Sequence, residues 1–211
     1  EAYKPGAVRG SGKALQVTRQ VGAFNGLRII APLKVTVSSD VPAGQVILDG
    51  DHNILALVQT TVNDGVLEIK LSGSVTTKKE LTAKLSAEQL DSIHAFGASN
   101  VVVQSGQIDS LEVKLTGAST IKIEPKVGTL SGVVTGASTL HANTLEASSV
   151  ELEISGASTT ELKGRTETLK LDLTGASTAK LDLTEQSGSV RADGASSVKG
   201  VAKLKEPLKV D

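Results

Sequence analysis

Gly97-Ala98-Ser99-Asn100 opens a series of six short glycine motifs that decides the fold of this chain. The next four read GAST and the last reads GASS, and they begin at Gly117, Gly136, Gly156, Gly175 and Gly194. Successive glycines are therefore 19 or 20 residues apart. A constant period of this length is typical of a solenoid, in which each repeat buries its apolar face only against neighbouring repeats.

The residues on either side of each motif alternate between apolar and polar. Residues 111–115 read LEVKL and residues 169–173 read LKLDL, directly before two of the motifs. Strict alternation is the period of a strand with one buried face. Apolar residues resume four and six positions after each glycine, and a third, shorter segment such as 145–150 completes the repeat. Three segments per repeat favour a three-sided coil.

Charged residues at a spacing of 19 predict the register between coils. Residues one repeat apart in parallel coils are lateral neighbours about 4.8 Å apart. Opposite charges then face each other in the pairs Glu151–Lys170, Glu161–Lys180, Lys163–Asp182 and Asp172–Arg191. Like charges meet in only two pairs, Glu153–Asp172 and Lys180–Lys199. Cross-strand pairing of opposite charges favours this register.

The direction of the motif side chains stays open at this stage. If the alternation runs unbroken through the motif, its Gly and Ser point inward, and its Ala and the flanking Thr point outward. If the chain turns a corner at Gly, the two sides exchange. Serines that point inward would need hydrogen bonds, because buried polar groups are almost always paired.

The composition limits which residue types can form the core and which classes of partner are expected. The only aromatic residues are Tyr3, Phe24 and Phe96, and Trp, Met and Cys are absent, so the core must be aliphatic and disulfides are excluded. The 22 basic and 23 acidic residues include no basic run, which argues against nucleic acid as a partner. No stretch approaches 18 consecutive apolar residues, so we expect no membrane-spanning segment.

The chain divides into three parts. Residues 1–13 are rich in Gly, Pro and Ser and are typical of a linker. Residues 14–90 are predicted to form an irregular β region that caps the solenoid or shares its core. Within it we expect a hairpin across Asn63-Asp64-Gly65 and a short helix over 51–59 with Asp51 as its N-cap. Residues 91–211 are predicted to form a β-helix with six Gly-Ala-Ser coils.

Three sequence features carry a resemblance to a known family. FNGLRI at 24–29, NDGVLEI at 63–69 and the recurrent GAST turns resemble the putative autotransporter-adhesin head GIN domain, over roughly residues 20–205. The family usually has a second glycine where this chain has Ser99 and Ser119, and its Asn is kept only at Asn100. The resemblance implies a right-handed parallel β-helix, a Bacteroidetes-type source and an adhesive role without assigned activity. It also implies export to the periplasm, the outer membrane or the cell exterior.

Few residues point to catalysis. His52, His94 and His141 are far apart in the sequence, so we expect no metal site, no cofactor and no catalytic residues. Glu153 and Asp172 are the exception, because lateral carboxylates about 5 Å apart serve retaining glycoside hydrolysis or hold calcium as in β-helical pectate lyases. Lys170 and Arg191 beside them favour an ordinary solvated face instead.

The threonines that flank the motifs form the candidate ligand face. In the unbroken register they project outward in two files with an alanine file between them, although β-branched residues also suit strands for structural reasons. The candidate residues are Thr116, Thr120, Thr135, Thr139, Thr159, Thr174 and Thr178. The sequence therefore favours a non-enzymatic binding or adhesion module for an extended glycan or surface protein. A polysaccharide-acting enzyme using Glu153 and Asp172, and a structural scaffold, are the alternatives.

Overall fold

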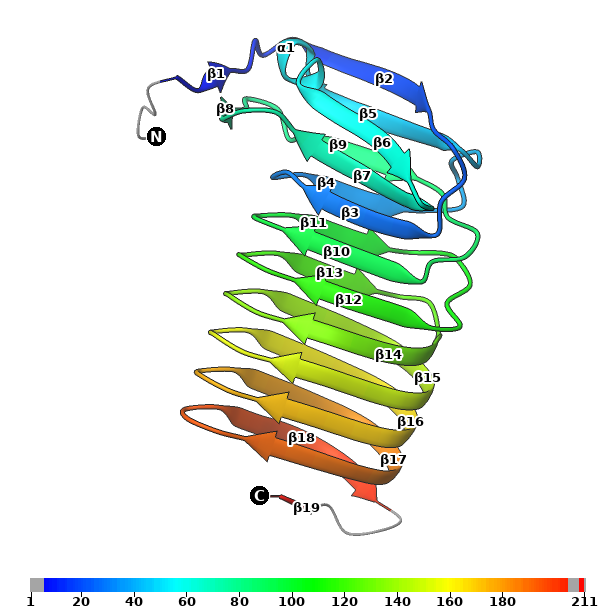
Figure 1. Ribbon diagram of the computed structural model, residues 1–211, viewed down its shortest axis with the longest axis vertical. Coiled ribbons are helices and arrows are strands. Elements are labelled where there is room, and N and C mark those ends of the chain that lie inside the picture. Colours follow the sequence, from blue (N-terminus) through cyan, green and yellow to red (C-terminus); the bar gives the residue numbers. More distant parts are fainter. Residues whose placement is uncertain (1–5, 205–208, 211) are drawn as a thin grey trace.

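The protein is a nearly all-β solenoid that stacks its coils along one long axis (Figure 1). The computed structural model describes residues 6–204 and 209–210. Parallel pairing of each coil with the next builds the stack. The strands of the regular part are β10 (Ser92–Phe96), β11 (Asn100–Val103), β12 (Leu111–Leu115), β13 (Thr120–Ile123), β14 (Val127–Val134), β15 (Thr139–Ile154), β16 (Thr159–Leu173), β17 (Thr178–Ala192), β18 (Ser197–Leu204) and β19 (Lys209–Val210).

The predicted register between coils is confirmed. Strand β15 pairs in parallel with β16, which places Glu151 opposite Lys170 and Glu153 opposite Asp172. Strand β16 pairs in the same way with β17, and β17 with β18. All four opposite-charge pairs and both like-charge pairs are therefore lateral neighbours, as the spacing of 19 residues predicts.

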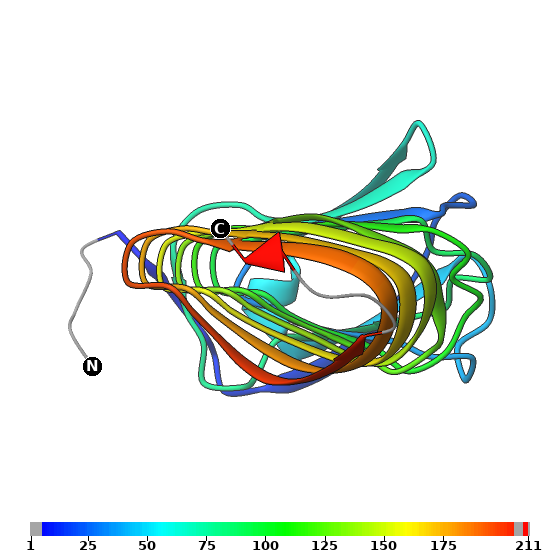
Figure 2. The same ribbon diagram turned by 90° about the horizontal axis from the view of Figure 1, so that it is seen from below.

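Each regular coil has two long sides joined by a short third segment, so the three apolar segments that the sequence predicts are all present (Figure 2). The sides meet at a sharp corner on the Gly-Ala-Ser motif and join at a rounded bend opposite to it (Figure 2). In the lower coils one strand of 15 or 16 residues runs from one corner to the next. The short segment at 145–150 belongs to that strand, and the bend is taken up by a register shift between Ala142 and Leu145.

A single aliphatic core runs through the stack from Leu27 to Val190. Leu115, Val134, Ile154 and Leu173 occupy one inward column, and each is at most 1 % exposed. The core continues without a break into the N-terminal region through residues such as Leu27. Burial of apolar surface, worth about 25 cal/mol per Å², is the main stabilising contribution in a chain so poor in aromatic residues.

The N-terminal region supplies a cap and the first two levels of the stack. We call each level, with one strand on either side, a rung. Its strands are β1 (Val8–Arg9), β2 (Ala14–Gln20), β3 (Gly26–Ile30), β4 (Lys34–Val37), β5 (Gln45–Asp51), β6 (Val58–Asn63), β7 (Val66–Leu71), β8 (Val75–Thr76) and β9 (Thr82–Leu85). Strand β3 pairs in parallel with both β7 and β10, and β4 pairs with both β9 and β11. The rung formed by β3 and β4 therefore lies between two rungs that follow it in sequence. Antiparallel β2 and β5 cover the end of the stack.

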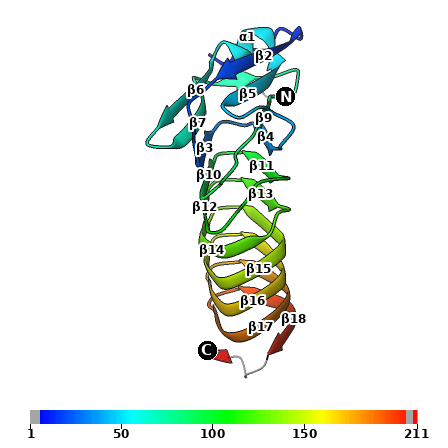
Figure 3. The ribbon, with the colours of Figure 1, turned by 90° about the vertical axis from the view of Figure 1, so that its right-hand side faces the viewer.

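The predicted hairpin is confirmed. Strands β6 and β7 are antiparallel and are joined by Asp64 and Gly65, with φ of 48° and 75°. Two residues with positive φ make the tight turn that suits hairpin twist. The hairpin projects sideways from the stack (Figure 3).

The predicted helix is shorter than expected, and Asp51 has another role. Helix α1 spans only His52–Leu55, and the side chain of Asp51 does not cap it. The buried Asp51 carboxylate instead accepts hydrogen bonds from the backbone N–H groups of Gly12, Lys78 and Lys79, at 2.6, 2.8 and 3.1 Å. Strand β1 also pairs with β8, so residues 6–13 are held against the cap, unlike the free linker that the sequence suggests.

Candidate functional site

The corner of the solenoid is defined by a column of buried serines. Five motif serines are at most 1 % exposed, namely Ser99, Ser119, Ser138, Ser158 and Ser177. Their hydroxyls donate to nearby backbone carbonyls. Ser177 donates to the carbonyl of Thr174 at 2.6 Å, and the single hydroxyl hydrogen of Ser99 is shared between the carbonyls of Phe96 and Ala31, at 2.7 and 2.9 Å. These bonds satisfy the hydroxyls that the inward direction removes from water.

Each of the two proposed orientations of the motif is partly right. The chain does turn a corner at glycine, because the motif glycines have φ between 75° and 82°. The sides nevertheless do not exchange, since Ser points inward while Ala and the flanking Thr face outward. Only glycine fits this corner: a Cβ on Gly136 would lie 2.4 Å from the carbonyl oxygen of Gly117.

The seven candidate threonines border this corner on both sides. Thr120, Thr139, Thr159 and Thr178 are successive lateral partners after the corner, and all are half-buried. Thr116, Thr135 and Thr174 occupy the equivalent position before the corner. Exposed alanines such as Ala137 form the apex between the two files. The surface is therefore a convex edge, with the alanines at its apex.

This edge, which we call the threonine corner, carries no charge along its middle. The two threonine files and the alanines at the apex contain only small neutral residues from Thr116 to Thr178. Charged residues lie at the ends of the two files: Lys34, which is the lateral partner of Asn100, and Asp193. Such a surface can offer hydroxyls and methyl groups to a ligand, and it has no arrangement suited to acid–base chemistry.

The acidic pair also lies where the register places it. Glu153 and Asp172 are lateral neighbours, and Arg191 follows Asp172 in the same file. They border a shallow hollow of about 430 Å³. Lys170 lies beside them and contacts Glu151, with 2.6 Å between Nζ and Oε1. Its hydrogen bond to Glu151 raises the pKa of Lys170, so the ammonium stays charged and the face is electrostatically mixed.

The three histidines lie apart on different elements. His52 is exposed on α1, His94 lies near Glu112 on neighbouring strands, and His141 lies 3.3 Å from Glu161. Over residues 6–204 and 209–210, no group of three or more His, Asp or Glu side chains could hold a metal ion.

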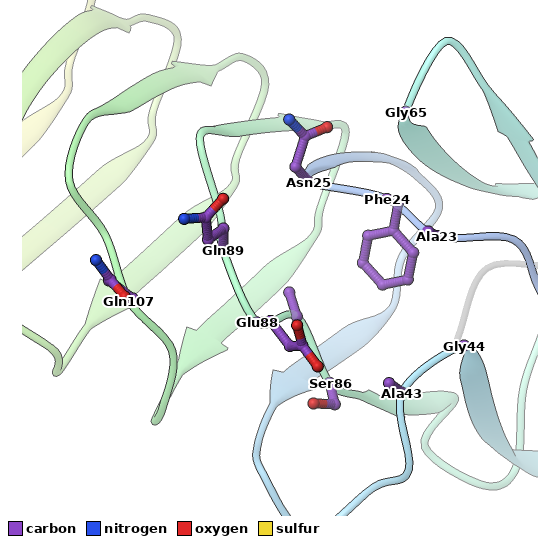
Figure 4. Close-up of a pocket in the computed structure, with 11 residues that line it drawn as sticks. Ala23, Phe24, Asn25, Ala43, Gly44, Gly65, Ser86, Glu88, Gln89 and Gln107 are labelled. Carbon is purple, nitrogen blue, oxygen red and sulfur yellow. The ribbon is translucent and has the colours of Figure 1, made fainter.

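Sequence reasoning missed a wide cleft in the N-terminal half of the molecule. It lies at the rounded bend of the N-terminal half, opposite the threonine corner, and has a volume of about 900 Å³ (Figure 4). Its walls come from five segments far apart in sequence, at 23–25, 43–44, 65, 86–89 and 107. No local motif links these segments. The one available signal is the rarity of aromatic residues, because Phe24 lines the cleft.

One protein-family model matches most of the chain. The family model described as "Putative auto-transporter adhesin, head GIN domain" matches residues 23–205. No curated protein matches the chain. In the part of the chain that the structure describes, no helix is long and apolar enough to cross a membrane.

Three solved structures of similar fold come from Bacteroidetes and are named as putative adhesins. The protein from Parabacteroides distasonis is 22 % identical, with a TM-score of 0.72 over 97 % of this chain and 100 % of that one. The protein from Parabacteroides merdae is 20 % identical, with a TM-score of 0.72 over 98 % and 99 %. The protein from Bacteroides fragilis is 20 % identical, with a TM-score of 0.70 over 94 % and 99 %. At these identities the likeness shows the fold alone.

Proposed function

We propose that this chain, which belongs to the putative auto-transporter adhesin head GIN domain family, is a non-enzymatic binding module that holds an extended glycan or protein along its threonine corner. Family and structural neighbours support an adhesion-like module at the cell surface or in an exported location. The proposal adds the ligand surface. The observation that carries it is the lateral register of Thr120, Thr139, Thr159 and Thr178, which repeats one uncharged unit at every coil.

The corner is rigid, and rigidity favours binding by many weak contacts. Backbone hydrogen bonds link the corner of each coil to the next, at 2.6–2.8 Å between the alanine nitrogen and the preceding glycine oxygen. A surface that is already ordered loses little conformational entropy when a ligand binds. With coils about 4.8 Å apart, four equivalent threonines extend over about 14 Å. That length suits several units of a polymer or a stretch of protein surface.

An enzymatic role has weaker support. Glycoside hydrolysis needs two carboxyl groups that converge on a bond inside a cleft. Glu153 and Asp172 are close, but they project from a strand face beside Lys170 and Arg191. The threonine corner is convex and carries no acid.

Two parallel measurements test the proposed function. The protein is applied to immobilised mucin, collagen and bacterial capsular polysaccharide, and the release of reducing sugar is followed in the same samples. We expect retention on at least one polymer and no reducing sugar above background. The double variant Glu153→Gln, Asp172→Asn should be retained as well as the natural chain. Release of reducing sugar that this variant abolishes would overturn the proposal in favour of an enzyme.

A further inference from the structure

We infer that the cleft beside Phe24 is a saccharide-binding subsite selective for neutral sugars. The inference rests on the proposed binding function, but it uses a surface on the opposite edge of the solenoid from the threonine corner. Three features carry it: the shape of the cleft, an aromatic ring on one wall, and a set of neutral amides without a cation.

The cleft exists because the bends of the upper coils are longer than those below. Seven residues, 104–110, connect β11 to β12, whereas β15, β16 and β17 run through the bend without interruption. Gln107 of that connection, Gly65 of the β6–β7 turn and residues 86–89 are among the groups that border an open volume of about 900 Å³. Ligand pockets of proteins range from about 300 to 1,000 Å³, so the cleft can hold more than one sugar ring.

Phe24 supplies an apolar wall. Its side chain packs against the hydrophobic core and is half-buried, and its ring borders the open cleft (Figure 4). The face of an aromatic ring carries negative electrostatic potential, which attracts the polarised C–H groups on the apolar face of a pyranose. Phe24 is the only aromatic residue among those that line the cleft.

Neutral amides supply the polar contacts. The side chains of Gln89 and Gln107 lie on the far side of Glu88 from the Phe24 ring in the view of Figure 4. Their backbones are fixed, because residues 89 and 107 form a parallel bridge and the Gln107 nitrogen donates to the Glu88 carbonyl at 3.1 Å. The Gln107 Nε2 donates to Asp109 at 3.0 Å, which leaves its carbonyl oxygen as an acceptor. Amides donate and accept at once, as sugar hydroxyls require.

The charge of the cleft selects against anionic sugars. None of the 11 lining residues, all in the described part of the chain, is Lys, Arg or His, and Glu88 is an acid. Asp91 adds a second carboxylate next to Asn25, whose amide donates to it. A uronic or sialic acid would meet like charge without a compensating cation. A peptide that binds by adding a strand to a sheet would need a free strand edge, and these walls are loops.

The test compares the full chain with substitutions that separate the two surfaces. The natural chain is applied to an array of neutral, sialylated and uronate-containing oligosaccharides, and the best neutral ligand is titrated by calorimetry. Phe24→Leu keeps apolar packing and removes the ring, and should weaken binding at least tenfold. Phe24→Trp should retain it. Phe96→Leu, the matched change outside the cleft, and Thr139→Lys, Thr159→Lys should change the Kd by less than about twofold.

Several results would overturn the inference. These are no neutral saccharide bound, a preference for uronates, or equal affinity of Phe24→Leu and the natural chain. Loss of saccharide binding in Thr139→Lys, Thr159→Lys alone would also overturn it, while it would leave the proposed corner function standing. Melting curves of every variant separate lost binding from lost folding.

Discussion

The amide nitrogen of Ala137 lies 2.7 Å from the carbonyl oxygen of Gly117 on the preceding coil. This hydrogen bond continues the parallel ladder through the corner, where a solenoid would otherwise leave backbone groups unpaired. The same contact recurs at the other motifs from Ala118 to Ala195. It requires a left-handed glycine whose missing side chain lets successive corners approach.

The first prediction separates the two reasons why the corner needs glycine: its left-handed backbone conformation and the close approach of the neighbouring coil. Gly97 and Gly136 share φ near 81°, but a Cβ on Gly97 would meet no atom within 4 Å, whereas one on Gly136 would lie 2.4 Å from the Gly117 oxygen. Gly97→Ala should therefore lower the unfolding free energy by about 1–2 kcal/mol, the cost of the left-handed conformation. Gly136→Ala should lower it by about 3 kcal/mol or more, because the coils must also separate. Urea denaturation measures both, and equal losses would contradict this account of the corner.

The second prediction concerns a flaw in the core. Thr160 is 0 % exposed, lies between Leu140 and Ala179 in an inward column, and its hydroxyl has no hydrogen-bond partner. Thr160→Val should stabilise the protein by about 1–2 kcal/mol, because a buried unsatisfied hydroxyl is removed at constant shape. For a chain of this length that raises Tm by about 2–4 °C per kcal/mol. The outward Thr159→Val is the control and should change stability by less than about 0.5 kcal/mol. A lower Tm for Thr160→Val would refute the prediction.

The third prediction concerns acid stability through Asp51. Burial by itself raises the pKa of Asp51, but the backbone N–H groups of Lys78, Lys79 and Gly12 and the charge of Lys78 outweigh it, and the pKa is lowered. A depressed carboxyl pKa stabilises the fold above the unfolded value of about 3.9, and this contribution is lost as the pH falls through the folded pKa. This contribution to Tm should therefore be lost progressively as the pH falls below about 4.

Asp51→Asn is the matched variant for that experiment. It should have a lower Tm than the natural chain at pH 7 and a shallower decline toward pH 2, because its amide does not titrate. Parallel curves for the two proteins between pH 5 and pH 2 would show that Asp51 does not couple stability to pH.

The regular coils could be predicted from sequence because their information is local and repeated. The spacing from Gly117 to Gly136 fixes the coil length, and the pair Glu151–Lys170 reports the register. The inward direction of Ser177 could not be predicted, because it depends on a hydrogen bond to the carbonyl of Thr174 that only the finished corner provides.

The strand pairing of the N-terminal region could not be predicted from sequence, because the order of its strands in space differs from their order in the chain. Strand β3 lies between β7 and β10, and alternation within residues 26–30 carries no information about either partner. Asp51 illustrates the same limit. The prediction of a helix N-cap used only neighbouring residues, whereas the hydrogen-bond partners of the Asp51 side chain, Gly12 and Lys78, are distant in sequence. The cleft beside Phe24 is assembled from five such segments, so no spacing could reveal it.

The claim that the threonine corner is the ligand surface is tested most directly by one comparison of paired lysine substitutions. Thr139→Lys, Thr159→Lys places two charges on lateral neighbours at the corner, and Ser149→Lys, Thr168→Lys places two charges on lateral neighbours away from it. Both variants carry the same added charge and the same repulsion between neighbours. On the immobilised polymer that retains the natural chain, the corner variant should lose retention at least tenfold and the second variant should keep it within about twofold. Equal retention of the two variants would contradict the central claim.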